Sequence, residues 1–288
     1  MKDTYFMTAL ISLFKENGVE FGNPWQHKIQ YKKNYLELDQ FEENSGFTAD
    51  YHFQIANGVD ISALSEVKAV VERPELWSVS INGHVVEKEE GKYWIDKDFP
   101  VFKIGAYLKP GKNTISVVAD RMSIFAELMP VYIIGDFKVQ PEKVGFEITN
   151  GKLAGLGSWK DAGYIFYSDK VSYAQKFNIE KGTAAFKVKL NKWNGTVTEV
   201  LVNNQEAGII AWEPEELDIT KFLSEGENEV TVRVVGSLKN TFGEFYREKT
   251  SWIYGPHGWN NAPEHQPAFD KYYIPDYGLF EPVSYTHL

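Results

Sequence analysis

The fold class follows from the stretch Ile104-Gly-Ala-Tyr-Leu-Lys-Pro-Gly-Lys-Asn113, which leads into the apolar run Thr114-Ile-Ser-Val-Val-Ala119. A Gly-x-Asn turn followed by alternating β-branched residues is typical of a chain that turns into a half-buried strand. The same plan returns in Ile219-Thr-Lys-Phe-Leu-Ser-Glu-Gly-Glu-Asn228, which leads into Glu229-Val-Thr-Val-Arg-Val234. This pattern indicates that the chain repeats one β-rich unit.

Three further pieces precede this turn in both halves, and their order is the same. The first half has Tyr51-His-Phe-Gln-Ile55, Val67-Lys-Ala-Val-Val71 and Val79-Ser-Ile-Asn-Gly83, and the second half has Lys176-Phe-Asn-Ile179, Phe186-Lys-Val-Lys-Leu190 and Val200-Leu-Val-Asn-Asn204. The offset is 121 residues between Asn82 and Asn203 and 115 residues between Asn113 and Asn228. A repeat this long predicts a tandem duplication of a whole domain and not a solenoid unit.

The small recurring motifs suit the scaffold of such a domain. Asn-Gly and Asn-Asn after a strand predict tight turns, because these residues tolerate positive φ. Asp218 or Thr220 is placed to cap free N–H groups of the half-turn of helix before Leu223. We therefore assign these motifs to structure and not to chemistry.

Strand signals dominate the rest of the chain, with dense turn residues between them. Helical periodicity is scarce after residues 5–14, where a short helix is stopped by Asn17-Gly18. We therefore expect an all-β fold of two tandem jelly-roll β-sandwiches with a short N-terminal helix. Further strands are expected at residues 28–31, 35–38, 131–137, 146–149 and 171–179.

The expected domain boundaries follow from these elements. Residues 1–33 form the N-terminal helix and a linker, and residues 34–138 form the first β-sandwich. Residues 139–283 form the second β-sandwich with a long aromatic C-terminal segment. Residues 284–288 follow a finished strand, so we expect them to lie outside the fold.

Composition limits the classes of function. The 288 residues carry a formal net charge of -10, which makes nucleic acid and anionic membrane poor partners. Cysteine is absent, which excludes disulfides, cysteine nucleophiles and thiolate metal sites. No apolar run approaches the roughly 20 residues of a membrane span. Residues 5–14 lack the small-residue cleavage site of a signal peptide, so a helix is the better interpretation.

The repeated motifs resemble the sugar-binding jelly-roll domains of glycoside hydrolases, of which the family 2 sugar-binding domain is the familiar form. The second half is similar to the C-terminal, galactose-binding-like β-sandwich region of large bacterial enzymes of the α-L-rhamnosidase type. The motifs that carry this likeness are Trp212-Glu-Pro214, Asp218-Ile-Thr220, Ser237-Leu-Lys-Asn240, Gly255-Pro-His257 and Tyr277-Gly-Leu-Phe-Glu-Pro282. The resemblance covers residues 34–283.

This resemblance implies a carbohydrate ligand, a place downstream of a catalytic barrel, and a role in bacterial polysaccharide degradation. We find no alternating strand and helix pattern for the barrel, which needs about 250 residues. We therefore expect that Met1 is an internal start or that the gene is a fragment. The resemblance also favours a periplasmic or extracellular location and an upstream catalytic domain as a partner.

Motifs for catalysis and metal binding have little support in the sequence. A glycosidase needs two carboxylates about 5 to 10 Å apart, and the sequence does not pair its many carboxylates. No Gly-x-Ser-x-Gly elbow and no phosphate-binding glycine loop occurs. His257, His265 and Asp270 match no standard metal spacing. Structural calcium stays open, because loop oxygens that hold calcium leave no signature here.

Residues 240–275 form an unusual segment in which aromatic residues alternate with Gly, Pro, Asn and His. A loop this long is usually functional or disordered, and its aromatic content argues against disorder. Aromatic rings and amides suit the C–H faces and hydroxyls of sugars. The candidate carbohydrate-binding residues are Trp212, Trp252, Tyr254, His257, Trp259, Asn260 and Asn261. The competing interpretation is that these residues serve packing. In it, the aromatic segment packs over the sandwich or against a neighbouring domain, and Trp212 is buried inside the sandwich.

The sequence therefore predicts a non-catalytic region of a glycoside hydrolase that binds sugar or braces the catalytic domain, without a cofactor. One alternative is a glycoside hydrolase with its own active site, which requires a deep pocket with two close carboxylates. At least one of these carboxylates would have a raised pKa. The other alternative is a structural protein-interaction module, in which residues 240–275 form a flat, buried surface.

Overall fold

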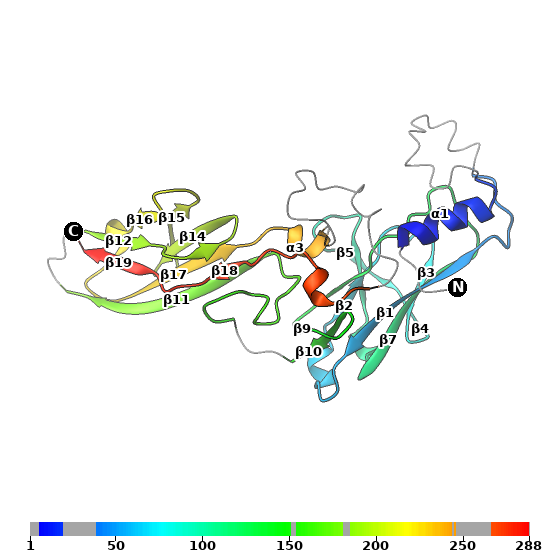
Figure 1. Ribbon diagram of the computed structural model, residues 1–288, viewed down its shortest axis with the longest axis horizontal. Helices are drawn as coiled ribbons and strands as arrows, with labels where there is room; N and C mark the ends of the chain where they lie inside the picture. Colours follow the sequence, from blue (N-terminus) through cyan, green and yellow to red (C-terminus); the bar gives the residue numbers. More distant parts are fainter. Residues whose placement is uncertain are drawn as a thin grey trace. The chain divides into compact units, whose positions relative to one another are not determined.

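The computed structural model describes residues 6–19, 39–150, 154–180, 185–243, 245 and 266–287. The chain divides into two compact units. Unit 1 comprises Met1–Asn150 and Tyr246–Tyr272, and unit 2 comprises Gly151–Phe245 and Tyr273–Leu288. Both units are built from β-strands with a few short helices (Figure 1). The predicted all-β fold is confirmed.

Unit 1 has two sheets in its described residues. The larger sheet has the order β4-β3-β7-β1-β10-β9, and the smaller has the order β5-β6-β2-β8. The strands are β1 (Phe47–Ile55), β2 (Lys68–Val70), β3 (Ser78–Ile81), β4 (His84–Val86), β5 (Lys88–Tyr93), β6 (Pro100–Lys103), β7 (Gly111–Ala119), β8 (Tyr132–Ile134), β9 (Lys138–Pro141) and β10 (Phe146–Thr149). The helices are α1 (Phe6–Glu16) and the 3₁₀ turns η2 (Ile61–Leu64) and η3 (Gly105–Tyr107).

The long strands of unit 1 explain why a sandwich forms. β7 buries every second residue from Asn113 to Ala119, so one face of its sheet is largely apolar. β1 pairs with β7 in antiparallel register along its whole length, from Phe47 to Ile55. The buried faces enclose a core of mainly aliphatic side chains. Burial of this apolar surface stabilises the unit by about 25 cal/mol per Å².

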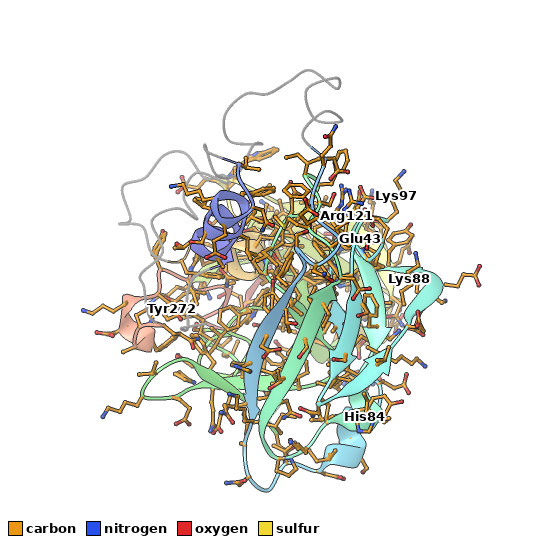
Figure 2. All side chains as sticks on the ribbon, turned by 90° about the vertical axis from the view of Figure 1, so that its right-hand side faces the viewer. Glu43, His84, Lys88, Lys97, Arg121 and Tyr272 are labelled. Atoms are coloured by element: carbon orange, nitrogen blue, oxygen red, sulfur yellow. The ribbon has the colours of Figure 1, made fainter. Side chains whose placement is uncertain are left out.

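The margins of unit 1 are polar. β4 and β5 carry exposed side chains, and Figure 2 shows His84 and Lys88 on the outside of the unit. β5 has the sequence Lys-Glu-Glu-Gly-Lys-Tyr, which has no strand pattern, and the sequence analysis predicts no strand there. Pairing with β6 holds this charged segment extended.

Unit 2 has sheets of the orders β11-β17-β14-β15, β16-β12-β19 and β13-β18 in its described residues. The strands are β11 (Lys170–Ile179), β12 (Phe186–Lys189), β13 (Trp193–Asn194), β14 (Val197–Val202), β15 (Gln205–Ile210), β16 (Glu216–Asp218), β17 (Gly226–Val235), β18 (Gly278–Leu279) and β19 (Ser284–His287). The helices of unit 2 are η4 (Thr220–Phe222) and α3 (Lys239–Phe242). A further 3₁₀ turn, η6 (Phe269–Lys271), belongs to unit 1.

The main sheets of the two units share a strand plan. The order β4-β3-β7-β1 in unit 1 corresponds to β15-β14-β17-β11 in unit 2, and all these pairs are antiparallel. In both units a 3₁₀ turn and a Gly-x-Asn turn precede the central strand. The repeated motifs of the sequence therefore occupy matching places.

Each unit contains the same pair of asparagines, Asn82 with Asn113 and Asn203 with Asn228. In each pair the amide of the first side chain donates to Oδ1 of the second over 2.9 Å. Asn113 and Asn228 are buried, and each donates to two backbone carbonyls of its own turn. Asn82 and Asn203 both have a φ of 51°, as the turn prediction requires.

The cap of η4 also follows the prediction. The carboxylate of Asp218 accepts from the backbone N–H of Thr220 over 2.9 Å and from its hydroxyl over 2.6 Å. These hydrogen bonds lower the pKa of Asp218, because they favour the charged form. Asp218 lies one residue before the N-cap of η4, Ile219, whereas Asp60 is itself the N-cap of η2 and accepts from the N–H of Ser62 over 2.9 Å.

The structure corrects two expected boundaries. β9 and β10 lie in the large sheet of unit 1, where β10 pairs in parallel with β1, so unit 1 extends beyond residue 138. Residues 284–287, which were expected outside the fold, form β19 and pair with β12. The physical reason is burial: the ring of Tyr285 lies 5.0 Å from that of Phe177, centroid to centroid.

Removal of residues 284–288 is expected to lower the free energy of unfolding of unit 2 by about 2–3 kcal/mol, because the Phe177 ring loses its contact with Tyr285 and one edge of β12 becomes exposed. Urea unfolding of the shortened and the full chain measures the difference. The matched control is Tyr285→Phe, since the buried Tyr285 hydroxyl has no hydrogen-bond partner among the described residues and its loss should leave stability unchanged. Equal stability of the shortened and full chains would contradict the assignment of β19.

Candidate functional site

Among the tryptophans in the described residues, Trp212 is the one whose side chain projects into solvent. Its side chain is 80% exposed, whereas Trp77, Trp94 and Trp193 are partly buried and Trp159 is buried. A large aromatic ring in solvent is unusual, because tryptophan is highly buried on average. The interpretation of Trp212 as a buried residue that closes the sandwich is therefore wrong.

The loop that carries Trp212 connects β15 to β16 and is fixed on its β16 side. The backbone N–H of Leu190 donates to the carbonyl of Glu215 over 2.9 Å, which continues the pairing of β12 with β16. Lys187 of β12 forms an ion pair with Glu216 at 2.7 Å. These contacts hold the loop while the Trp212 ring stays exposed.

Several exposed groups lie close to Trp212 along the chain. Ile209 is 54% exposed on β15, which is an edge strand of its sheet. The exposed carboxylate of Glu213 follows Trp212 directly in the chain. An aromatic ring can stack on the C–H face of a sugar, and carboxylates can accept hydrogen bonds from its hydroxyls. The loop thus offers the two kinds of contact that a sugar needs.

The other candidate carbohydrate-binding residues lie outside the described residues. They are Trp252, Tyr254, His257, Trp259, Asn260 and Asn261. Their role in binding stays a prediction.

The described end of the aromatic segment packs against unit 1. The ring of Phe146 on β10 lies 5.7 Å from that of Phe269 and 5.0 Å from that of Tyr272, both in edge-to-face geometry. Such pairs contribute about 0.5–1.5 kcal/mol beyond area burial. For Phe269 and Tyr272, packing is the interpretation that the geometry supports.

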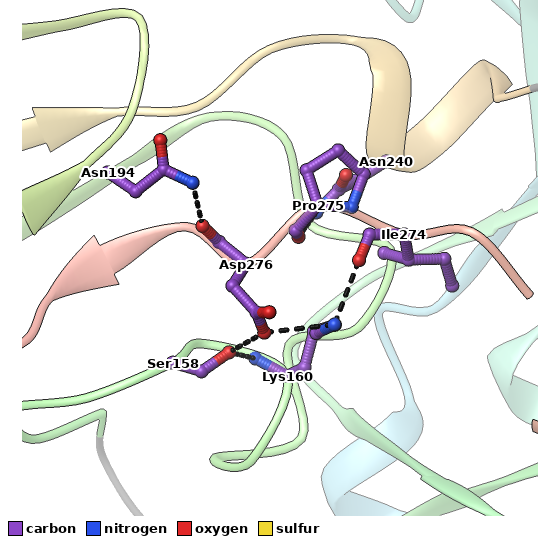
Figure 3. Close-up of polar contacts among 7 residues, drawn as sticks. All are labelled: Ser158, Lys160, Asn194, Asn240, Ile274, Pro275 and Asp276. Carbon is purple, nitrogen blue, oxygen red and sulfur yellow. Dashed lines mark hydrogen bonds and ion pairs between the residues drawn. The ribbon is translucent and has the colours of Figure 1, made fainter. Parts of the chain in front are cut away.

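Asp276 anchors the chain just after this segment (Figure 3). Its carboxylate accepts from the hydroxyl of Ser158 over 2.7 Å and pairs with the ammonium of Lys160 at 2.9 Å. Lys160 also donates to the carbonyl of Ile274 over 2.8 Å, and Asn194 donates to the carbonyl of Asp276. Because these groups satisfy one another, we assign the cluster to anchoring and not to ligand binding.

Unit 1 contains a cavity between the end of β2 and the chain after β7. Two half-buried carboxylates, Glu72 and Glu127, contribute to its wall. The remaining lining residues are Tyr51, Val71, Trp77, Val117, Leu128, Met129 and Val131. The sequence pattern does not point to this carboxylate pair.

The surroundings of these carboxylates favour their neutral forms. Burial raises the pKa of Glu72 to about 7, and the charges of Glu127 and Asp98 add to the shift, which Arg73 partly offsets. Burial also raises the pKa of Glu127, and Arg73 again opposes the shift. The pair thus has one property of the enzyme alternative, a carboxyl group of raised pKa.

The cavity lacks the other property, which is depth. It has room for roughly one water molecule and therefore does not admit a sugar ring. In the described part of the chain, no group of three or more His, Cys, Asp or Glu residues could hold a metal ion. The described helices include none that is long and apolar enough to cross a membrane.

Comparison with known proteins gives only distant likenesses. No protein-family model and no curated protein matches the chain. A rhamnosidase from Novosphingobium sp. PP1Y is 16% identical with a TM-score of 0.32, over 85% of this chain and 22% of that chain. An α-L-rhamnosidase from Streptomyces avermitilis is 13% identical with a TM-score of 0.25, over 66% of this chain and 21% of that chain.

A β-D-mannosidase from Dictyoglomus thermophilum is 12% identical with a TM-score of 0.27, over 78% of this chain and 27% of that chain. This chain therefore spans between 21% and 27% of the length of these three proteins. Overlaps this low carry no argument about activity.

One signal could have found the carboxylate pair. Glu127 is the single charge in the apolar run Ile124-Phe-Ala-Glu-Leu128, and a lone carboxylate among buried residues is informative. Glu72 has no such signal, because Arg73 and Glu75 beside it suggest a solvated charge cluster. Only the fold brings the two carboxylates together.

Proposed function

We propose that this chain is a non-catalytic, carbohydrate-binding accessory region of a glycoside hydrolase, with Trp212 as the sugar-stacking residue. The observation that carries the proposal is the 80% exposure of Trp212 on an anchored loop. Because the loop is anchored beside β16, its backbone loses little conformational entropy when a ligand binds.

The chemistry around Trp212 fits a neutral polyhydroxylated ligand. The ring supplies an apolar face, and the neighbouring carboxylate of Glu213 supplies acceptors for hydroxyl groups. The net charge of -10 disfavours an anionic partner. Binding of this kind is weak, because a single stacked ring buries a small area.

We propose further that the two units arose by tandem duplication and then diverged in role. The shared strand plan and the matching asparagine pairs support a common origin. Unit 2 carries the exposed Trp212 in the loop before β16. Unit 1 has Trp94 in the loop before β6, and this tryptophan is partly buried. Unit 1 would then act mainly as a spacer toward an upstream catalytic domain.

A glycan array with the full chain and with Trp212→Ala tests the proposal. The full chain should bind a defined set of neutral glycans, and the variant should lose roughly 10-fold or more of its affinity for them, equivalent to about 1.4 kcal/mol. Tyr93→Ala is the matched control, because Tyr93 is a 60% exposed aromatic residue of unit 1. Equal binding by Trp212→Ala, or no glycan bound by the full chain, would contradict the proposal.

A further inference from the structure

The N-terminal helix α1 packs on a short segment that follows β7. This segment, residues 122–128, buries its even-numbered side chains, Met122, Ile124, Ala126 and Leu128. They form one apolar cluster with Leu10, Leu13 and Phe14 of α1. Docking of α1 therefore depends on where this segment lies.

Buried and partly exposed side chains alternate along residues 122–128, so the Glu127 side chain points away from the buried side chains beside it. Glu127 is half-buried and contributes to the cavity wall together with Glu72, which follows β2. The same segment therefore contributes to the α1 cluster through its even-numbered residues and to the carboxylate pair through Glu127. A force between the two carboxylates acts directly on the surface that holds α1.

The groups around Glu72 and Glu127 carry too little positive charge to neutralise both carboxylates. Asp98, from the loop between β5 and β6, adds a third carboxylate to the field at Glu72. Arg73 is the cation that acts on both glutamates, but its Nε lies 2.8 Å from the carboxylate of Glu75. Tyr51 is partly buried beside the pair, and its hydroxyl donates to a backbone carbonyl over 2.9 Å.

Trp77 connects the pair to both apolar clusters. Its indole N–H donates to the backbone carbonyl of Glu72 over 3.0 Å, and its ring contributes to the cavity wall. The ring packs against the sandwich core and against the α1 cluster, where its centroid lies 6.2 Å from that of Phe47. A movement at Glu72 is therefore transmitted to the α1 cluster through a rigid side chain.

We propose that Glu72 and Glu127 form a pH-sensitive latch for helix α1. While the pair keeps a proton, residues 122–128 stay against the sheet and α1 stays docked. When both carboxylates are ionised, their repulsion across a cavity that holds roughly one water displaces the segment and loosens α1. The latch lies in unit 1 and does not involve Trp212, so it stands apart from the proposed sugar binding.

The direction of the pH dependence follows from the shifted pKa values. The folded pKa of Glu72 is about 7, above its ordinary 4.5, so the docked state is favoured at low pH. This contribution is fully present below about pH 4.5 and is lost as the pH rises through 7. Burial shifts Glu127 in the same direction.

Hydrogen exchange of the full chain tests the latch. Protection factors, which already correct for the intrinsic pH dependence of exchange, are measured for the amides of Leu13 and Phe14 at pH 5.5 and 8.5. We expect protection to fall on the order of 10-fold at the higher pH, since each pKa unit corresponds to a factor of ten and partial exposure weakens the effect. The amides of β17 in unit 2 are the internal reference and should change by less than a factor of two.

Two neutral isosteres make the test specific. Glu72→Gln and Glu127→Gln should each keep α1 protected at pH 8.5 and remove the pH dependence. Glu90→Gln, an exposed glutamate on β5, should keep the wild-type response. A flat response in the unmodified chain, a preserved response in both isosteres, or loss of α1 protection in both at every pH would each overturn the proposal.

Discussion

Replacement of Asn228 by alanine is expected to lower the free energy of unfolding of unit 2 by about 3–4 kcal/mol, because the turn loses four hydrogen bonds to one buried side chain together. The Asn228 amide donates to the carbonyls of Ser224 over 2.7 Å and Gly226 over 2.9 Å. Its Oδ1 accepts from the backbone N–H of Ser224 and from the side chain of Asn203, each over 2.9 Å. Alanine replaces none of these contacts.

Urea unfolding of unit 2, followed by circular dichroism, measures this loss. Asn113→Ala should destabilise unit 1 by a similar amount, since Asn113 makes the corresponding hydrogen bonds there. Asn178→Ala is the control, because Asn178 is exposed on β11 and its change should stay within about 0.5 kcal/mol. A small effect of Asn228→Ala, comparable to that of the control, would show that the asparagine pair does not hold the turn.

Trp159→Ala is the second change with a large expected effect, a loss of about 3–5 kcal/mol in unit 2, as for other buried tryptophans. The Trp159 ring is 1% exposed and meets the rings of Tyr167 and Tyr277, both at 5.9 Å between centroids. Its indole N–H donates to the hydroxyl of Tyr173 over 2.9 Å. Removal leaves a cavity and takes one hydrogen-bond partner from the Tyr173 hydroxyl, which still accepts from the N–H of Leu279 over 3.3 Å.

Thermal unfolding of the full chain, with Trp212→Ala as the matched tryptophan control, measures the effect. Trp212 is exposed, so its removal should change stability by no more than about 0.5 kcal/mol. A Trp159→Ala variant as stable as Trp212→Ala would contradict the core of unit 2 described here. The pair of variants therefore separates a structural tryptophan from the proposed binding tryptophan.

The turns and helix ends of the scaffold were predictable from the sequence, because the residues next to them in the chain decide their conformation. Asn82 and Asn203 adopt the left-handed turn conformation that their sequences indicate, and Asp218 caps its helical turn. These features depend on a few neighbouring residues, whose preferences do not need the rest of the fold. The helix at the N-terminus is confirmed for the same reason, with Gly18 at a φ of 82° just beyond its end.

Features that depend on pairing between distant segments were not predictable. β5 is charged and becomes a strand because it pairs with β6. β19 is a strand because it pairs with β12 and because its Tyr285 ring packs against Phe177. The meeting of Glu72 and Glu127 likewise follows from the fold and not from any spacing. Trp212 was a candidate from the sequence, but its exposure depends on how the loop before β16 is anchored.

The central claim is that Trp212 makes the sugar contact, and calorimetric titration tests it most directly. The neutral oligosaccharide with the strongest array signal is titrated into the full chain and into Trp212→Ala, whose folds are first compared by circular dichroism. We expect one site per chain with a dissociation constant in the range of about 10 μM to 1 mM, weakened roughly 10-fold or more in the variant. Unchanged affinity in a folded Trp212→Ala variant would contradict it.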